Sequence, residues 1–250
     1  MMTIKMFQDL FTISQAEMEE IDKSILLVQA YTGKSEFEIN KMSVKKFNRL
    51  CAKIKNAFDN VGKKMIEGKP KNLIKANGKW YWLNFEINEM TAGRYVETAT
   101  FGSDVVGNLH KLMATMCTPM KWSWKGLVPD KYKAEDHSKY ADDMLEADFD
   151  HCYQACVFFL RSFQRINESF TVLFGGDTDR KRDVEPAPDE FQRSYGWMYN
   201  AKLVSEFENI SLNEVWELNV FQFLNDLSYI KVKNKYDADK LERSTKQSIR

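Results

Sequence analysis

The sequence has 250 residues, 44% of them hydrophobic and 13% aromatic, so it can fold around a substantial core. Its 36 basic and 36 acidic residues cancel, which excludes a protein drawn to nucleic acid or membranes by its overall charge. The four cysteines follow no pattern, no apolar run is long enough to span a bilayer, and the N-terminus lacks a signal-peptide pattern. We therefore expect a soluble, reduced, intracellular protein.

Three consecutive helices are expected between residues 14 and 62. Ser14 with Glu17, and Ser35 with Glu38, have the spacing of a capping box, in which each side chain binds a backbone amide of the other residue. A further serine, Ser43, is expected to cap the third helix.

The letters GKS at 33–35 raise the question of a phosphate-binding loop. That motif needs a glycine five positions before its second glycine, because backbone amides wrap phosphates only where the chain turns tightly. Val28 stands there instead, inside an amphipathic helix with no hydrophobic strand before it. We interpret Gly33 as the end of one helix and expect no ATP binding.

A small antiparallel sheet is expected at about 73–101. Asn77-Gly78 between two β-rich runs is a strong hairpin signal, and Gly93 is expected to turn the chain into a third strand. Helices are expected over 103–118 and 140–170, with a loop between them. The predicted fold class is α+β, mainly helical with one small antiparallel sheet.

Residues 1–174 are expected to form the main domain, 175–190 an exposed linker, and 191–250 a C-terminal helical segment. In this last segment, Ser211 and Glu214 form another capping box, and apolar residues recur at spacing three from 215 to 230. Seven basic and three acidic residues follow in 231–250, a net charge of +4. The residues predicted to bind a partner are Trp216, Phe221, Leu224, Leu227, Tyr229, Lys231, Lys233 and Lys235. The alternative is a terminal helix packed on its own core.

Residues 41–79 hold 12 basic and two acidic residues, a net charge of +10, next to Trp80. Basic groups beside stacking aromatic rings are typical of nucleic-acid binding. The candidate patch comprises Lys45, Lys53, Lys63, Lys64 and Trp80, and we expect weak, non-specific association. The alternative is that the lysines coat a helix while the rings fill a sheet core.

Two further clusters contain residues that could support chemistry. His151, Cys152 and Cys156 lie close together, but a structural zinc site needs four ligands, so we interpret them as helix residues with buried thiols. The acidic run at 135–150 places Asp142, Glu146 and Asp150 on one helical face, where they would bind a cation or act as acid and base; we prefer a solvated face. We predict no catalytic residue, no cofactor and no metal ligand.

Three stretches resemble proteins of tailed bacteriophages. Residues 3–50 and 91–122 ("TAGRYVETATF…CTPMKW") resemble small tail-assembly and structural proteins, and the segment from "YGWMYNAKLVSEF" to "NKYDADK" resembles the helical end of tail assembly chaperones. The resemblance implies a non-enzymatic protein that binds other virion or tail proteins in an oligomeric assembly, in the host cytoplasm or the virion. It assigns no functional residue.

Four functions follow from this sequence. The first is a tail assembly chaperone, and the second is a permanent component of the head–tail connector or tail. The third is a nucleic-acid-binding accessory protein that uses the basic segment 41–79. The fourth is a metal-dependent hydrolase that uses the acidic run.

Overall fold

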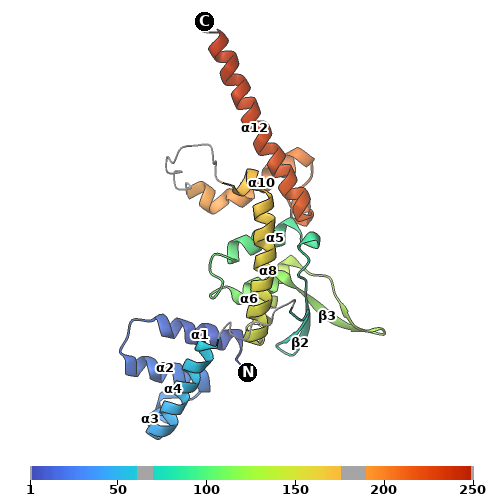
Figure 1. Ribbon diagram of the computed structural model, residues 1–250. Coiled ribbons are helices and arrows are strands. Elements are labelled where there is room, and N and C mark those ends of the chain that lie inside the picture. The colour runs from blue at the N-terminus through green and yellow to red at the C-terminus, as the bar shows by residue number, and fades with distance from the viewer. Residues whose placement is uncertain (1, 61–69, 176–189, 249–250) are drawn as a thin grey trace. The chain divides into compact units, whose positions relative to one another are not determined.

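The computed structural model describes residues 2–60, 70–175 and 190–248 (Figure 1). Its contacts divide the chain into two compact units: unit 1 comprises residues 1–85 and 101–159, and unit 2 comprises residues 86–100 and 160–250. Helices and one four-stranded antiparallel sheet are present, which confirms the α+β, mainly helical fold class. The expected linker, 175–190, lies almost wholly outside the described residues. Unit 2 combines the C-terminal segment with residues 86–100 and 160–174, which were expected to belong to the main domain.

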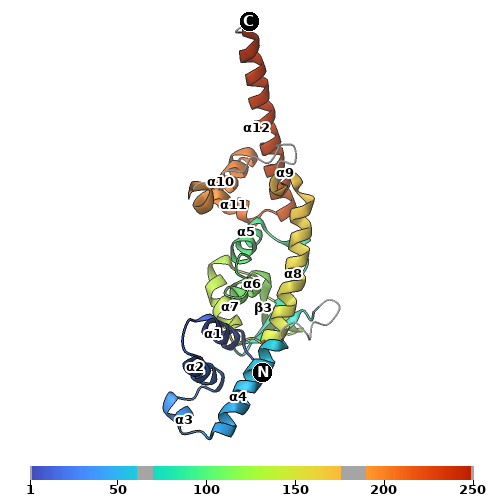
Figure 2. The ribbon, with the colours of Figure 1, turned by 60° about the vertical axis from the view of Figure 1, so that its left-hand side comes forward.

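Unit 1 begins with a group of helices that pack around a small apolar core. Figure 2 shows α1, α2 and α4 lying together, and Leu10, Val28, Ile39 and Ile54 form the buried centre of this group. The helices of unit 1 are α1 (Ile4–Gln15), α2 (Glu20–Thr32), α3 (Glu36–Asn40), α4 (Val44–Asp59), α6 (Leu109–Met116), η2 (Ala134–Asp136), α7 (His137–Met144) and the part of α8 (Phe149–Ser169) up to residue 159.

The turn at GKS joins two helices, as predicted. Gly33 ends α2 in the left-handed region, at φ 68°, and its amide donates to the Gln29 carbonyl at 2.8 Å. The capping box of Ser35 and Glu38 is present at the start of α3, so that prediction is confirmed. Ser43 precedes α4 without a side-chain capping hydrogen bond.

The capping box predicted at Ser14 and Glu17 is wrong. Ser14 lies in the last turn of α1 and donates its hydroxyl to the Phe11 carbonyl at 2.7 Å. The helix expected from Ser14 begins later, at Glu20, as α2, and the preceding α1 was not expected. Thr3 caps α1, and the Ile4 amide donates to the Ala147 carbonyl at 3.1 Å. A local cap and a long-range backbone hydrogen bond therefore both fix the start of α1.

The sheet belongs to unit 1 and has the order β1-β2-β3-β4. The predicted hairpin is confirmed, because Asn77 and Gly78 take the positive φ values of 47° and 77° that a tight turn needs. The predicted third strand after Gly93 is wrong: these residues form α5 (Ala92–Phe101), which buries Ala92, Tyr95 and Thr98 at spacing three. The strands are β1 (Leu73–Ala76), β2 (Lys79–Leu83), β3 (Cys117–Ser123) and β4 (Gly126–Pro129).

Two helix predictions are corrected by the structure. The helix expected over 103–118 is confined to α6, and Cys117 begins β3 opposite Leu83, so strands β3 and β4 occupy part of the expected loop. The helix expected over 140–170 is interrupted between α7 and α8. Asp142, Glu146 and Asp150 therefore do not share one face of a continuous helix.

Unit 2 has a core of aromatic and aliphatic side chains. Tyr95 stacks on Phe163 with ring centres 4.8 Å apart, contacts Trp197 edge-on, and donates its hydroxyl to Asn167 Oδ1 at 2.6 Å. The elements of unit 2 are η1 (Ile87–Glu89), most of α5, α8 from residue 160, α9 (Thr171–Phe174), α10 (Glu190–Glu208), α11 (Leu212–Glu217) and α12 (Val220–Ser248).

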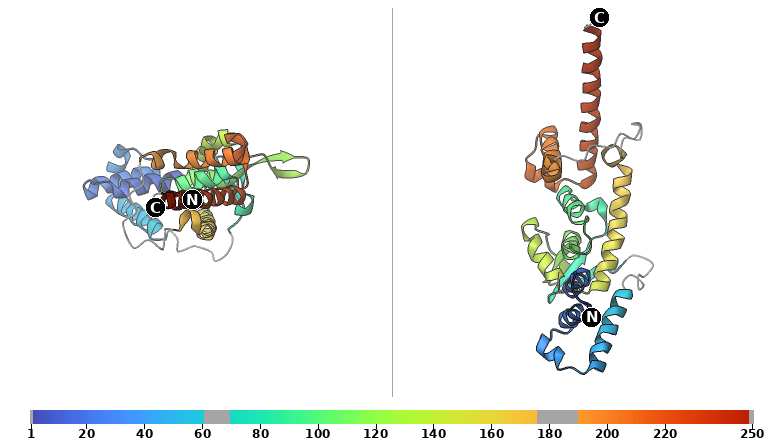
Figure 3. Two further views of the ribbon diagram at one scale, coloured as in Figure 1. Left: turned by 90° about the horizontal axis from the view of Figure 1, so that it is seen from above. Right: turned by 90° about the vertical axis from the view of Figure 1, so that its left-hand side faces the viewer.

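The predicted C-terminal helix is divided into α11 and α12. The capping box of Ser211 and Glu214 is confirmed at the start of α11. The helices separate where the Leu218 carbonyl accepts from the Ala92 amide at 2.8 Å and the Val220 amide donates to the Met90 carbonyl at 2.9 Å. Figure 3 shows α12 continuing beyond α10 and α11.

Candidate functional site

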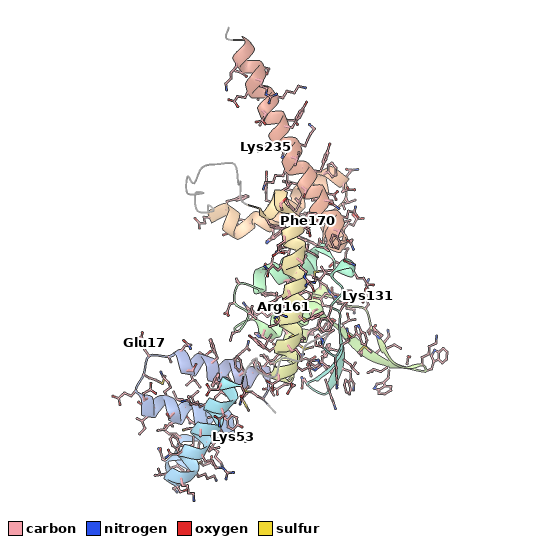
Figure 4. All side chains as sticks on the ribbon, in the orientation of Figure 1. Glu17, Lys53, Lys131, Arg161, Phe170 and Lys235 are labelled. Carbon is pink, nitrogen blue, oxygen red and sulfur yellow. The ribbon has the colours of Figure 1, made fainter. Side chains whose placement is uncertain are left out.

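The residues predicted to bind a partner fall into buried and exposed sets. Leu224 and Leu227 belong to the core of unit 2 and are 0% and 5% exposed. Trp216 and Phe221 are half-buried. The exposed residues, Tyr229, Lys231, Lys233 and Lys235, lie further along α12, where Figure 4 labels Lys235. The apolar stripe therefore packs largely on its own unit, and only its end and the basic segment face solvent.

The exposed part of α12 carries a short apolar stripe. Tyr229, Val232 and Tyr236 follow one another at spacings of three and four, so they lie on one helix face, and they are 55%, 54% and 61% exposed. We call these three residues the α12 stripe. Lys233 donates to Asp237 one turn further on, and this hydrogen bond raises the pKa of Lys233. Charged side chains thus surround an exposed apolar face.

A cavity of about 350 Å³ lies between α9, α10 and α12 in unit 2. Phe174, Trp197, Leu203 and Ile230 supply apolar walls, and Lys231 supplies a charged group. Tyr199 also lines it, and α10 exposes at least half of each of four large side chains, Phe191, Tyr195, Met198 and Tyr199. Exposed aromatic residues around a concave apolar surface are typical of protein interfaces.

The carboxylate of Asp226 in unit 2 lies where its ionised form is unfavourable. Burial raises the pKa of Asp226, and the negative charge of Glu208 raises it further. The buried Oδ2 atom of Asp226 has no hydrogen-bond partner among the described residues. This side chain therefore destabilises unit 2 when it is ionised.

The predicted nucleic-acid residues lie in different elements of unit 1. Lys45 and Lys53 are exposed on α4, and Lys53 Nζ lies 5.4 Å from the centre of the Tyr31 ring. Trp80 is half-buried on β2, with Lys75 Nζ 5.8 Å from its ring centre. No described hydrogen bond or cation–π contact joins the α4 lysines to Trp80. Lys63 and Lys64 lie outside the described residues.

Sequence reasoning missed the most exposed aromatic residues of the chain. Trp122 lies near the end of β3 and Trp124 lies in the β3–β4 turn; they are 77% and 91% exposed. Trp82 on β2 is 41% exposed. The segment "KWSWKG" was expected to be a loop, although its alternation of tryptophan with polar residues is typical of a strand with one solvent face.

The histidine and the two cysteines considered as a metal site lie on α8. Burial raises the pKa of the Cys156 thiol to about 12 and also raises the pKa of Cys152, so neither is prepared to act as a thiolate. His151 Nε2 lies 2.9 Å from the Lys71 carbonyl. Within residues 2–60, 70–175 and 190–248, no cluster of three or more His, Cys, Asp or Glu side chains is arranged to hold a metal ion.

Comparisons with known proteins found no matching family model, no matching curated protein and no matching solved structure. Among the helices that the structure describes, none combines the length and apolar character needed to cross a membrane.

Proposed function

We propose that this protein is a bacteriophage assembly or structural protein that acts by protein–protein contact, most like a tail assembly chaperone. The observation that carries the proposal is the exposed α12 stripe of unit 2; a second apolar surface, formed by the aromatic face of α10 and the cavity, lies on the other side of α12. The resemblance of three stretches of sequence to phage tail-assembly proteins supports the same function. We place the protein in the host cytoplasm during assembly.

The partner that fits this surface is an amphipathic, acidic helix of a tail protein. Tyr229, Val232 and Tyr236 have the spacing with which one helix packs along another. Residues 231–250 carry a net charge of +4, which is complementary to acidic side chains on that helix. Binding of this kind requires no catalytic group.

Binding to the tail proteins encoded by the same virus tests the proposal. Full-length protein is immobilised and its affinity for the purified tape-measure, tail-tube and portal proteins is measured. Replacing Val232 and Tyr236 together with Asp is expected to weaken binding at least tenfold, because charge would face the apolar side of the partner. The matched control is Asn213→Asp with Gln222→Glu, which adds the same two negative charges at exposed positions of unit 2 outside the α12 stripe, the cavity lining and residues 231–250.

The outcome also separates the two phage roles. Binding to a tail protein by a chain that immunoblotting does not detect in mature virions indicates a chaperone, whereas its presence there indicates a permanent connector or tail component. If none of the virion proteins binds, or if the double Asp variant binds as tightly as the unmodified chain, the proposal is wrong.

A further inference from the structure

One face of the sheet in unit 1 is lined by tryptophan. β1 and β2 bury alternate residues, Ile74, Tyr81 and Leu83 among them, on the face that α7 covers through Asp143. The opposite face carries Trp80 and Trp82, with Lys75 directly opposite Trp80 on β1. We call this solvent-facing side the tryptophan face.

The second hairpin carries a further tryptophan on the same side of β3 as Thr118, the residue opposite Trp82. Thr118 lies opposite Trp82, and alternation places residues 120 and 122 on the same side of β3 as Thr118; there Trp122 is paired with Leu127 of β4. Trp80 and Trp82 are one two-residue step apart on β2, about 7 Å, and Trp122 lies beyond the β2–β3 pairing, in the β3–β4 hairpin. Steps of this length are close to the distance between successive bases in an extended single strand.

The strands of this sheet carry no negative charge. They contain no Asp or Glu, and they hold three lysines, Lys75, Lys79 and Lys121. Lys79 and Lys121 are neutralised by ion pairs with Asp143 and Asp130, at 2.7 and 2.6 Å.

Two other lysines lie beside indole rings, one of them half-buried and the other exposed. Lys75 Nζ is 5.8 Å from the centre of the Trp80 ring. In the β3–β4 turn, Lys125 Nζ lies 4.7 Å from the centre of the Trp124 ring. Lys75 and Lys125 thus place positive charge next to the aromatic surface.

We propose that the tryptophan face binds single-stranded nucleic acid, with bases stacked on Trp82, Trp80 and Trp122 and phosphates beside Lys75 and Lys125. Stacking needs flat, exposed rings, and phosphates need basic groups without competing carboxylates; this face supplies both. Duplex DNA is not expected to bind in this way, because its bases are already stacked on one another. The predicted lysines of α4 have no part in this site.

Titration with a fluorescein-labelled twenty-nucleotide oligo(dT) or oligo(U) tests the proposal on the full-length protein at low salt. Stacking is expected to quench the intrinsic tryptophan fluorescence as binding raises the anisotropy of the label. Trp122→Leu keeps an apolar side chain but removes the stacking surface, and it is expected to weaken binding about tenfold or more; Trp122→Phe is expected to retain most of the affinity. Circular dichroism checks that each variant is folded.

Two charge variants locate the site. Lys75→Gln with Lys125→Gln is expected to reduce the slope of log affinity against log salt by about 0.7 for each phosphate that is no longer neutralised. Lys45→Gln with Lys53→Gln on α4 is the matched control and is expected to change the affinity less than twofold. If only the α4 pair weakens binding, the site proposed here is wrong and the patch expected from the sequence is favoured.

The remaining outcomes overturn the proposal. One is the absence of binding to either oligonucleotide at low salt, and another is a Trp122→Leu variant that binds as the unmodified chain does. A third is binding to vesicles of phosphatidylserine and phosphatidylcholine that Trp122→Leu abolishes, with no binding to oligonucleotides; this result would assign the face to a membrane surface.

Discussion

Asn77 donates a hydrogen bond from Nδ2 to Asp143 Oδ1 at 2.7 Å and so joins the turn of the β1–β2 hairpin to helix α7. The other carboxylate oxygen accepts from Lys79 Nζ at 2.7 Å and from the Tyr81 hydroxyl. Asp143 is 4% exposed, so three donors surround a buried charge. Burial alone would raise the pKa of Asp143, but hydrogen bonds from Lys79, Tyr81 and Asn77 outweigh it and lower the pKa.

Asp143→Asn is expected to lower the free energy of unfolding at pH 7 by about 1.5–3 kcal/mol, because it removes the charge to which three donors bind. The pKa of Asp143 is lower in the folded than in the unfolded chain. Its stabilising contribution is therefore complete above the ordinary value of 3.8 and is lost as the pH falls through the folded value. Urea unfolding at pH 7 and pH 3 should show the difference between variant and unmodified protein narrowing at pH 3.

The control for this prediction is Asp142→Asn, at an exposed neighbouring position, which is expected to change stability by less than about 0.5 kcal/mol. A difference between Asp143→Asn and the unmodified chain that stays constant from pH 7 to pH 3 would contradict the assigned role of the carboxylate.

Replacement of glycine by alanine is expected to have opposite effects on stability at two positions. Gly33 has φ 68°, where a side chain strains the backbone, so Gly33→Ala should destabilise the protein by about 1–2 kcal/mol. Gly196 lies inside α10, and an added Cβ would meet no atom within 4 Å, so Gly196→Ala should stabilise by about 0.5–1 kcal/mol. Thermal unfolding measures both, and shifts of Tm in the same direction would contradict this account.

Local signals predicted the features that local interactions create. The capping boxes of α3 and α11 and the turn at Asn77-Gly78 need only residues within three or four positions of one another. The partner strand of β2 could not be predicted in this way, because Cys117 pairs with Leu83 across 34 positions. The segment 92–101 was predicted to be a strand because its β-branched and aromatic residues favour strands. It forms a helix in the structure, in which the residues buried at spacing three lie on one face.

The candidate sites likewise combine features that local sequence predicts with features that depend on the tertiary structure. The sequence indicated an apolar C-terminal stripe, but only the tertiary structure separates Leu224, which is buried, from Tyr229, which is exposed. The tryptophan face depends on the register of three strands, and β3 comes from a segment that was expected to be a helix end and a loop. Trp122 and Trp82 are 40 positions apart, and no local pattern indicates that they share a face.

Asp226→Asn is expected to stabilise unit 2 at pH 7. Burial and the charge of Glu208 raise the pKa of Asp226 above 3.8, so the ionised form favours unfolding at neutral pH. The amide removes that charge, and the expected gain is about 0.5–1 kcal/mol. The gain should disappear as the pH falls below 3.8, where the carboxyl is protonated in both states. Chemical unfolding across this range checks the prediction, and an Asp226→Asn variant less stable than the unmodified chain at pH 7 would contradict it.

Leu224→Asp is expected to reduce the stability of unit 2, whereas removal of residues 231–250 is expected to weaken partner binding. Leu224 is 0% exposed, so an aspartate there would bury an unpaired charge and cost more than about 4 kcal/mol, enough to unfold unit 2. Residues 231–246 are all exposed. The free energy of unfolding of a chain that ends at Ile230 should therefore lie within about 1 kcal/mol of that of the full chain. This shortened chain should nevertheless bind its tail-protein partner at least tenfold more weakly, because Val232, Tyr236 and the basic residues are gone.

Chemical unfolding and affinity measurements on the two variants separate these effects. Tyr236→Phe, which keeps the α12 stripe apolar, serves as the control and should bind as the full chain does. If the chain ending at Ile230 is folded and binds every partner with unchanged affinity, the exposed part of α12 is only a terminal extension. If it is unfolded, residues 231–248 stabilise unit 2 through side chains such as Lys231 and Asn234 at the cavity, and the stability prediction is wrong.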